Sequence, residues 1–260
     1  MLKTFQGVID IQKEQIEGRN AVMEAIIAGR PIYKIYLKKG ERHGAIFRIM
    51  ELAKEKGIPL QEIDADAFYA MVRTSGHQGI CAAVSPKEYV EVDDILNHAS
   101  SLKEDPFIMV LNELTDPQNF GSIIRTADCL GVHGIIISKN RACGITPSVV
   151  KVSAGAAEYV KIARVTNIAS TLDDLKNKGL WVMGADADGR NCFEVDLAGP
   201  IALVIGGEDR GLGRLVREKC DMLICIPMKG HVGSMNAAVA ASILGYDIMR
   251  QRLSKNVGKS

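Results

Sequence analysis

Asparagine, serine and methionine side chains gather in one segment near the end of the chain, IPMKGHVGSMNAA, at residues 226–238. The residues leading into it, MLICIPM, are patterned as a buried strand, and a helix is predicted over about 236–252, with Ser234 able to cap it. Gly230 and Gly233 leave the main chain of the loop free to adapt to a ligand. Neither a Walker lysine motif nor a dinucleotide glycine fingerprint is present. The segment therefore suits an adenosine-like ligand held by main chain; an ordinary strand-to-helix turn is the alternative.

A second segment, NELTDPQNFGSIIRTADCLGV at residues 112–132, combines a side-chain amide with a guanidinium. Its pattern is a strand, a turn favoured by the Asp-Pro pair, and a helix that Ser122 can cap. Arg125 is predicted about one turn into this helix, with Asn119 in the turn before it. Helix N-termini attract anions, so a phosphate group can dock here. A solvent-facing helix arginine is the alternative.

A third segment, LVIGGEDRGLGRLVREKCD at residues 203–221, ends a buried strand and opens a glycine-rich turn. The glycines do not follow the GxGxxG spacing, which argues against a dinucleotide site. Gly206 permits close contact between the main chain and a ligand. Glu208 is either a partner for the dipole of the helix predicted over 213–220 or a functional carboxylate.

In chain order, the three segments resemble the three motifs of the SpoU (TrmH-type) RNA ribose 2'-O-methyltransferases, within the SPOUT superfamily. The resemblance covers residues 106–250, and its specificity lies in the combination of motifs. The residues that carry it are Asn119, six positions before Arg125, then Gly206 and Glu208 after a strand, and Ile226, Ser234 and Asn236.

The resemblance implies methyl transfer from S-adenosylmethionine to a ribose hydroxyl of structured RNA, without a metal ion. The donor-binding residues that it implies are Gly206, Ile226, Met228, Gly230 and Met235. The catalytic residues that it implies are Asn119, Arg125, Glu208, Ser234 and Asn236. By resemblance, Arg125 deprotonates the 2'-hydroxyl. Because a guanidinium has a pKa above about 12, the alternative is that Arg125 clamps a phosphate and stabilises the developing alkoxide.

From residue 106 onward, short apolar runs alternate with helical stretches. Such runs are typical of strands buried on both faces, so we expect an α/β domain over 106–260 with a mostly parallel sheet and helices on both sides. The resemblance adds a deep trefoil knot that holds the donor, and a homodimer in which the catalytic domains pack together.

Residues 1–88 alternate short helices and strands, which indicates a small α/β sandwich domain. Residues 89–105 are charged, have a proline next to each end, and are expected to form a linker with at most one short helix; a final surface helix of the first domain is the alternative. The GRNAVMEAI and HQGI segments resemble the N-terminal domain of the large-subunit ribosomal RNA guanosine 2'-O-methyltransferases. Shorter tRNA ribose methyltransferases lack this domain, so the resemblance favours ribosomal RNA.

Within the first domain, the stretch RPIYKIYLKKGERHGAIFR carries six basic residues and one acid, interleaved with Tyr33, Tyr36 and Phe47. This mixture suits contacts to an RNA backbone and stacking on unpaired bases, although a solvated edge is an equal alternative. His77, in the HQGI segment, is expected to be structural.

The bulk properties are those of an ordinary globular protein: 260 residues, a formal net charge of +1 and no apolar run of about 20 residues that would span a bilayer. Any RNA surface must therefore be local. The six cysteines form no CxxC pair, so disulfide and zinc sites are not expected and a reducing cytoplasm fits best.

Three competing functions follow. The nearest is the same reaction on tRNA. A non-catalytic RNA-binding assembly factor would not need all five catalytic residues, and an NAD-type dehydrogenase would need the missing glycine fingerprint.

Overall fold

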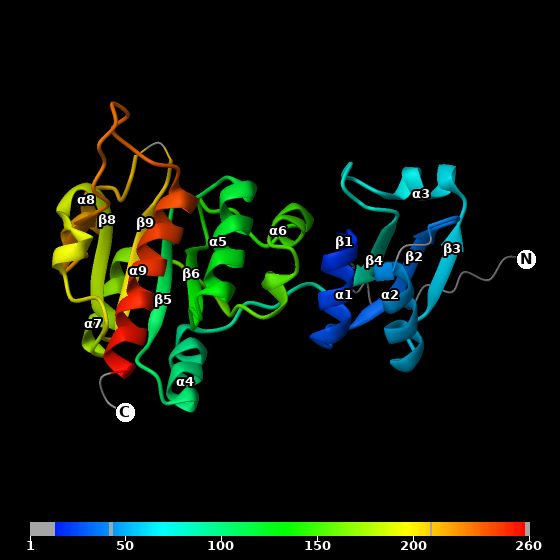
Figure 1. Cartoon of the computed structure of the whole chain (residues 1–260), viewed down its shortest axis with the longest axis horizontal. Coiled ribbons are helices and arrows are strands. Elements are labelled where there is room, and N and C mark those ends of the chain that lie inside the picture. The colour runs from blue at the N-terminus through cyan, green and yellow to red at the C-terminus, as the bar shows by residue number, and fades with distance from the viewer. Residues whose placement is uncertain (1–13, 42–43, 209, 258–260) are drawn as a thin grey trace, which may run out of the picture. The chain divides into compact units, whose positions relative to one another are not determined.

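The computed structural model describes residues 14–41, 44–208 and 210–257 (Figure 1). It divides the chain into two compact units, with the boundary between Lys87 and Glu88. Each unit has its own sheet and its own covering helices.

The N-terminal unit is built on a four-stranded sheet of order β1-β4-β2-β3, in which only the β2–β3 pair is parallel. Its strands are β1 (Glu14–Glu17), β2 (Ile32–Lys38), β3 (Leu60–Ile63) and β4 (Ile80–Val84). Its helices are α1 (Arg19–Ile27), α2 (Gly44–Glu55) and α3 (Ala65–Met71). This confirms the expected small α/β unit, and it adds β1, a strand that the sequence pattern did not indicate.

The second unit is built on a six-stranded sheet of order β10-β8-β9-β5-β6-β7, and every neighbouring pair is parallel. Its strands are β5 (Phe107–Asn112), β6 (Gly134–Ser138), β7 (Ile162–Val165), β8 (Trp181–Asn191), β9 (Ile201–Gly206) and β10 (Met222–Cys225). Its helices are α4 (Val92–Leu102), α5 (Pro117–Cys129), α6 (Pro147–Val152), α7 (Ile168–Asn177), α8 (Arg214–Lys219) and α9 (Ala237–Val257). Short 3-10 turns, η1 (Ala156–Glu158) and η2 (Cys192–Glu194), complete it. The predicted α/β fold is therefore confirmed; the trefoil knot stays a prediction.

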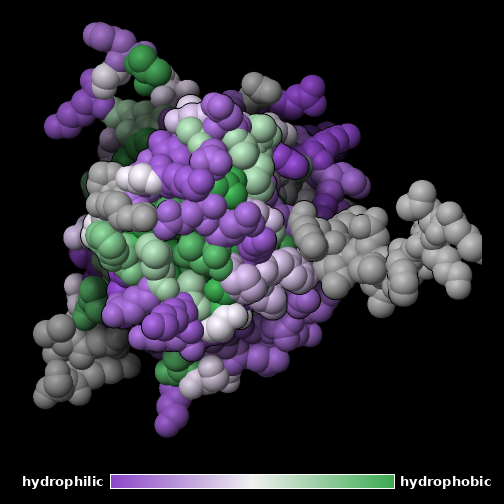
Figure 2. Space-filling view, turned by 90° about the vertical axis from the view of Figure 1, so that its right-hand side faces the viewer, coloured by the Kyte–Doolittle hydropathy of each residue, from purple (hydrophilic) through white to green (hydrophobic). Residues whose placement is uncertain are grey.

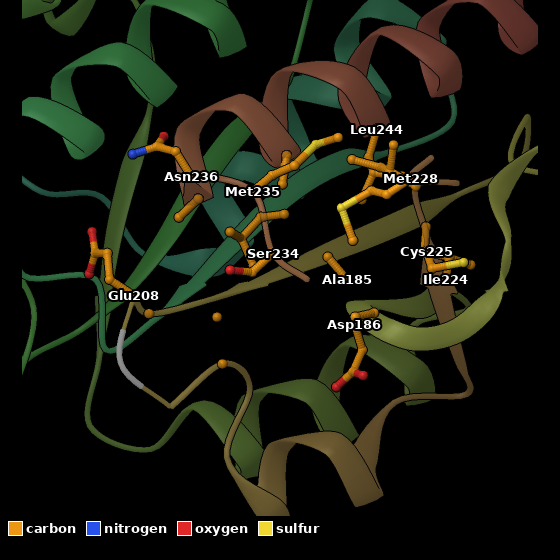
Figure 3. A pocket seen from close by; sticks show the side chains of 18 residues that line it. Ala185, Asp186, Glu208, Ile224, Cys225, Met228, Ser234, Met235, Asn236 and Leu244 are labelled. Atoms are coloured by element: carbon orange, nitrogen blue, oxygen red, sulfur yellow. The ribbon is translucent and has the colours of Figure 1, made fainter. Parts of the chain in front are cut away.

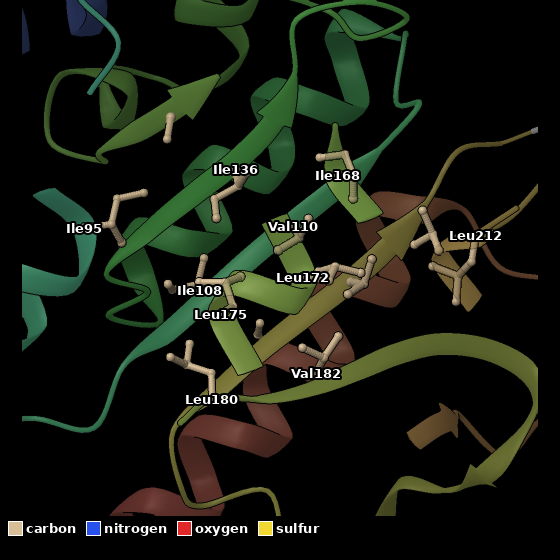
Figure 4. Close-up of a cluster of buried hydrophobic side chains, with 14 residues drawn as sticks. Ile95, Ile108, Val110, Ile136, Ile168, Leu172, Leu175, Leu180, Val182 and Leu212 are labelled. Carbon is tan, nitrogen blue, oxygen red and sulfur yellow. The ribbon is translucent and has the colours of Figure 1, made fainter. Parts of the chain in front are cut away.

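Both faces of the second sheet are covered, which explains why its strands read as continuous apolar runs. On one face, side chains of α4, α7 and α8 join alternate strand residues in a single buried cluster (Figure 4). On the other face α5 and α9 pack together, and the hydroxyls of Thr126 and Ser242 lie 3.0 Å apart. Gly245 allows α9 to approach the sheet, because a Cβ there would lie 2.8 Å from Met109.

The segment expected to be a linker belongs to the second unit. Residues 89–105 contain α4, and Ile95 of this helix is fully buried in the cluster shown in Figure 4. A Cβ at Gly134 would lie 2.6 Å from Ile95, so strand and helix are in close contact. Val90 forms a parallel bridge with Ala163. Amphipathic burial of α4 thus replaces the expected linker.

Two helix starts differ from the sequence expectation. Helix α5 begins at Pro117, and the carboxylate of Asp116 accepts hydrogen bonds from its first turn, so Ser122 is not the cap. Helix α9 is capped by Asn236, whose Oδ1 accepts from the main-chain N–H groups of Ala238 and Val239, instead of by Ser234. Proline at the first helical position and asparagine at the cap are the stronger signals at these two places.

All six cysteines are free, and burial raises the pKa of the Cys81 thiol to about 12 and that of Cys220 to about 11. The described residues include no group of histidine, cysteine, aspartate and glutamate side chains arranged to hold a metal ion. Within the same residues, no helix has the length and apolarity required to cross a membrane.

Candidate active site

A cavity of about 600 Å³ lies at the carboxyl ends of β8, β9 and β10 and at the start of α9 (Figure 3). This is the edge at which parallel α/β sheets bind their ligands, and the volume is in the range of small-molecule sites. The structure brings most of the predicted site residues to it. Those that line it are Gly206, Glu208, Ile226, Met228, Ser234, Met235 and Asn236.

One wall of the cavity comes from an excursion in β8. Leu223 pairs with Gly184, but the next residue of β10, Ile224, pairs with Arg190. Residues 185–189 therefore leave the ladder, and Ala185, Asp186 and Ala187 turn toward the cavity. The sequence analysis missed this wall, because a bulge inside a strand has no hydrophobic periodicity of its own.

The glycines of the turn after β9 are required by the turn itself. A Cβ at Gly206 would lie 2.2 Å from the carbonyl carbon of Gly211, and one at Gly207 would lie 2.4 Å from the main-chain oxygen of Glu113. A short bridge joins Gly207 to Gly211. Close packing of main chain against main chain thus fixes the position of the turn that carries Glu208.

Three side chains from distant segments form a chain of hydrogen bonds at the rim of the cavity. Asn236 Nδ2 donates to Asn119 Oδ1 at 2.8 Å, and Asn119 Nδ2 donates to Glu208 Oε1 at 2.6 Å. The direction is fixed at both ends: Asn236 Oδ1 already accepts from the first turn of α9, and an ionised carboxylate only accepts. Asn119 is thereby the link between the other two side chains.

Two predicted residues stand apart from this cavity. Arg125 follows Asn119 by six positions on α5, which rotates it by about 120° around the helix; its side chain is exposed and makes no ion pair with any described residue. Gly230 lies on the exposed loop between β10 and α9 and does not line the cavity. The single chain therefore assembles the asparagines, Glu208 and Ser234 without Arg125.

The lining of the cavity suits a cationic ligand with an apolar body. Two carboxylates line it, those of Glu208 and Asp186, and Figure 3 shows them on different sides of the opening. Met228, Met235 and Leu244 supply apolar surface, and no lysine or arginine of the described residues lines the space. Asp186 also pairs with Arg217 at 3.0 Å, which fixes its position. These residues fit a sulfonium-bearing nucleoside, whose positive centre would be repelled by basic side chains.

Comparison with known proteins agrees with this geometry. Residues 106–246 match the SpoU rRNA Methylase family, and residues 15–90 match the family described as RNA 2'-O ribose methyltransferase substrate binding. The chain is 47% identical over 242 residues to YacO of Bacillus subtilis, a TrmH family tRNA/rRNA methyltransferase, with 93% of this chain and 97% of YacO covered.

Two solved structures extend the comparison. The SpoU methyltransferase AviRb from Streptomyces viridochromogenes, in complex with the cofactor AdoMet, superimposes with a TM-score of 0.78 at 27% identity, covering 93% of this chain and 91% of AviRb. The TrmH/SpoU tRNA modifying enzyme of A. aeolicus superimposes with a TM-score of 0.53 at 28% identity, covering 63% of this chain and 85% of that enzyme. The chain therefore belongs to the SpoU (TrmH-type) methylase family and is an S-adenosylmethionine-dependent RNA 2'-O-methyltransferase.

Proposed function

We propose that this enzyme methylates the 2'-hydroxyl of a guanosine in large-subunit ribosomal RNA. The observation that carries the choice of RNA is the N-terminal unit, which matches a substrate-binding family over residues 15–90. The tRNA modifying enzyme of A. aeolicus covers 63% of this chain, whereas AviRb covers 93%. A substrate-binding unit in addition to the catalytic unit gives the protein more surface for RNA. This supports a larger RNA substrate than the catalytic unit by itself would recognise.

The reaction is an in-line displacement, so the protein must align the hydroxyl, help to remove its proton and exclude water. S-adenosylmethionine supplies an already activated methyl group when it is bound. The donor would be bound by main-chain groups and apolar side chains of four residues, Gly206, Ile226, Met228 and Met235. The carboxylates of Glu208 and Asp186 would face its positive charge. Ser234 and Asn236, which line the same cavity, would orient the ribose.

Arg125 is the residue that we propose acts on the RNA itself. It is exposed on α5 and has no carboxylate partner among the described residues, so its guanidinium is free to bind a phosphate. In that position it stabilises the alkoxide that develops as the 2'-hydroxyl loses its proton. A direct role as the base is the alternative, and the pH dependence of the rate distinguishes the two.

A homodimer explains how Arg125 reaches a reaction centre. Helix α9 carries a stripe of exposed apolar side chains, Val239, Ile243, Tyr246 and Leu253, which are 38–57% exposed. Their spacing of four, three and seven residues places them on one face of the helix. Exposed apolar stripes of this kind mark association surfaces. We propose that α9 of a second copy covers this stripe and that the pairing brings Arg125 of one copy to the cavity of the other.

The basic stretch of the N-terminal unit contributes less to RNA binding than its composition suggests. Arg30 is buried, pairing with Glu14 at 2.9 Å and donating to the main-chain oxygen of Ser85, so it is structural. Surface carboxylates pair with three more of its basic residues, which are Lys38, Lys39 and Arg48. Arg42 and His43 lie outside the described residues. Hydrophilic side chains nevertheless cover much of the surface seen in Figure 2 and surround smaller hydrophobic patches.

Two aromatic features of this unit remain. Phe47 is 55% exposed and available for stacking on a base. His77 is structural, as expected: its Nδ1 accepts from the main-chain N–H of Gly79 at 3.0 Å, and its ring packs edge-on against Phe68 and Tyr69. We propose that the protein works in the cytoplasm, where its free cysteines stay reduced.

The test is methylation of separated RNAs. Purified protein is incubated with labelled donor and with ribosomal RNA or tRNA in turn, and the 2'-O-methyl group is mapped. Label in a guanosine of large-subunit ribosomal RNA is the expected result. Label in tRNA alone would overturn the choice of substrate, and donor-independent RNA binding with no methylation would instead indicate an assembly factor.

A further inference from the structure

A second cavity, of about 540 Å³, lies at the carboxyl ends of β5, β6 and β7 in the same unit. No predicted site residue lines it. Its walls carry three arginines, Arg141, Arg210 and Arg214, and we refer to it as the arginine cavity. The first turn of α7 and the start of α8 complete its lining.

The arginine cavity is lined by cationic side chains. The cavity of about 600 Å³ described above, which we refer to as the cofactor cavity, is lined by acidic ones. Among the described residues that line the arginine cavity, Glu113 is the one carboxylate, and it pairs with Arg141 at 3.0 Å. Arg210 has no ion-pair partner in the described part of the chain, and Arg214 pairs only with Glu218 on the solvent side of its own helix, with its side chain 91% exposed. Two of three guanidinium groups are thus available to an anionic ligand, and their planar forks suit phosphate.

The two cavities are separated by a single turn of main chain. This turn follows β9 and contributes residues to both cavities. It lines the cofactor cavity with Gly206, Gly207, Glu208 and Gly211, and the arginine cavity with Arg210, Leu212 and Gly213. Two contacts hold parts of this turn in place. Asn112 Nδ2 donates to the main-chain oxygen of Leu212 at 2.9 Å in a buried position, and Gly207 packs against the main chain of Glu113. An RNA strand with one group in the first cavity therefore needs to extend across only this turn to reach the second.

The arginine cavity also offers uncharged groups that can contact a sugar or a base. The side chains of Asn140 and Thr166 line it and make no hydrogen bond to any described residue. Leu215, 56% exposed on the same wall, supplies an apolar surface. A space of this volume with cationic, polar and apolar walls matches one nucleotide with its phosphate.

We propose that the arginine cavity binds the nucleotide next to the methylated one in the substrate RNA, through its phosphate and its base. This inference rests on the proposed function, because it requires an RNA substrate whose target ribose lies at the cofactor cavity. It assigns to Arg210 and Arg214 the capture of the RNA strand, with no part in donor binding or methyl transfer.

The experiment compares charge reversal at the cavity with charge reversal elsewhere in the same unit. Arg210→Glu and Arg214→Glu are made singly and together. Lys178→Glu is the matched control, because Lys178 caps the far end of α7, pairs with Asp93 and lies away from the cavity. The RNA used is whichever separated RNA the wild type methylates. Binding is measured by fluorescence anisotropy over a series of salt concentrations, with donor affinity measured by calorimetry on each variant.

The double variant is expected to bind RNA roughly tenfold more weakly or worse, and to lower the slope of log affinity against log salt by about one for each phosphate group that the protein no longer binds. Donor affinity and the melting temperature are expected to stay at the wild-type values, and Lys178→Glu is expected to bind RNA normally. Wild-type RNA affinity in the double variant, or an equal loss in Lys178→Glu, would overturn the inference. A wild type that methylates no RNA at all would instead overturn the proposed function, and this outcome is seen before any variant is made.

Discussion

Asn236 and Asn119, separated by 117 positions in sequence, are joined by a hydrogen bond of 2.8 Å that makes the cap of α9 part of the rim of the cofactor cavity. The side-chain oxygen of Asn236 caps the N-terminus of α9, and its amide nitrogen donates to Asn119, which in turn donates to Glu208. The same residue therefore caps α9 through its acceptor and positions Asn119 through its donor, and the two contacts are separable by substitution.

Asn236→Asp is expected to separate them. Aspartate caps a helix as well as asparagine does, so stability should be retained, whereas Asn236→Ala should cost about 1 kcal/mol of unfolding free energy. In Asn236→Asp the carboxylate faces the acceptor oxygen of Asn119, so the chain to Glu208 is broken and the methylation rate should fall roughly tenfold or more, equivalent to about 1.4 kcal/mol. Thermal unfolding and single-turnover methylation measure the two effects; wild-type turnover in Asn236→Asp would contradict the functional role.

Gly206→Ala is expected to weaken donor binding strongly. The new Cβ would lie 2.2 Å from the main chain of Gly211, so the turn must move and carry Glu208 with it. Calorimetric titration with S-adenosylmethionine should show a loss of roughly 100-fold in affinity, about 2.7 kcal/mol. Gly199→Ala is the matched control, because a Cβ at Gly199 meets nothing within 4 Å. Equal donor affinity in the two variants would show that the turn does not shape the site.

Arg125→Ala is expected to leave the fold intact and stop catalysis. The side chain is exposed without an ion pair to any described residue, so the unfolding free energy should change by less than about 0.5 kcal/mol. The methylation rate should fall by roughly 100-fold, and donor affinity should not change. A wild-type rate that rises with pH above neutrality, and a flat profile in Arg125→Ala, would identify Arg125 as the base; a similar profile in both would identify it as a phosphate clamp. Full activity in Arg125→Ala would exclude both roles.

Tyr246→Asp is expected to convert a dimer into a monomer. Tyr246 is 56% exposed in the middle of the apolar stripe of α9, and a carboxylate buried there in an interface would be unpaired. Light scattering should report the mass of one chain for Tyr246→Asp and of two for the wild type. Phe193→Asp, which changes an apolar side chain that is 68% exposed outside α9, is expected to remain a dimer. A fully active monomeric wild type would refute the proposed pairing.

Glu17 is expected to make the free energy of unfolding depend on pH in the acidic range. Burial would raise the pKa of this carboxylate, but hydrogen bonds from Thr74, Arg73 and Gln15 outweigh it and lower the pKa below 4.5. A lowered pKa means that the ionised form stabilises the fold at neutral pH and that this contribution is lost as the pH falls below about 4.5 through the folded-state value. Glu17→Gln should unfold about 1–3 kcal/mol more easily at pH 7, because the amide keeps a single acceptor oxygen and one of the two main-chain donors, Arg73 or Thr74, loses its partner. Urea unfolding of both proteins should show this gap narrowing toward pH 3, and a constant gap would contradict the assignment.

Much of the fold could be predicted because both faces of the second sheet are covered. Strands in that setting are apolar throughout, as in FIMVLN of β5, and six such runs mark six strands. The sequence pattern did not indicate β1, because EQIE contains one apolar residue. Its last side chain, Glu17, is a buried carboxylate whose main-chain donors, Arg73 and Thr74, are more than 50 positions away. Long-range hydrogen bonds leave no periodic signal.

The candidate site likewise contains residues that the sequence could predict and residues that it could not. Residues inside recognisable motifs, such as Glu208 and Asn236, were predictable, because the motif fixes their spacing. The wall at Asp186 was not, since it depends on a break in register between β8 and β10. Ser234 and Asn236 are both good helix caps, and only the geometry of α9 decides between them.

The amide chain at the rim has a consequence for biosynthesis. Asn119 lies near the start of the second unit, and its donor Asn236 follows 117 positions later, after every strand of the second sheet. A nascent chain that has been translated only as far as β10 therefore contains the whole sheet but lacks the donor that orients Asn119. The rim is the last part of the cavity for which the ribosome supplies the residues.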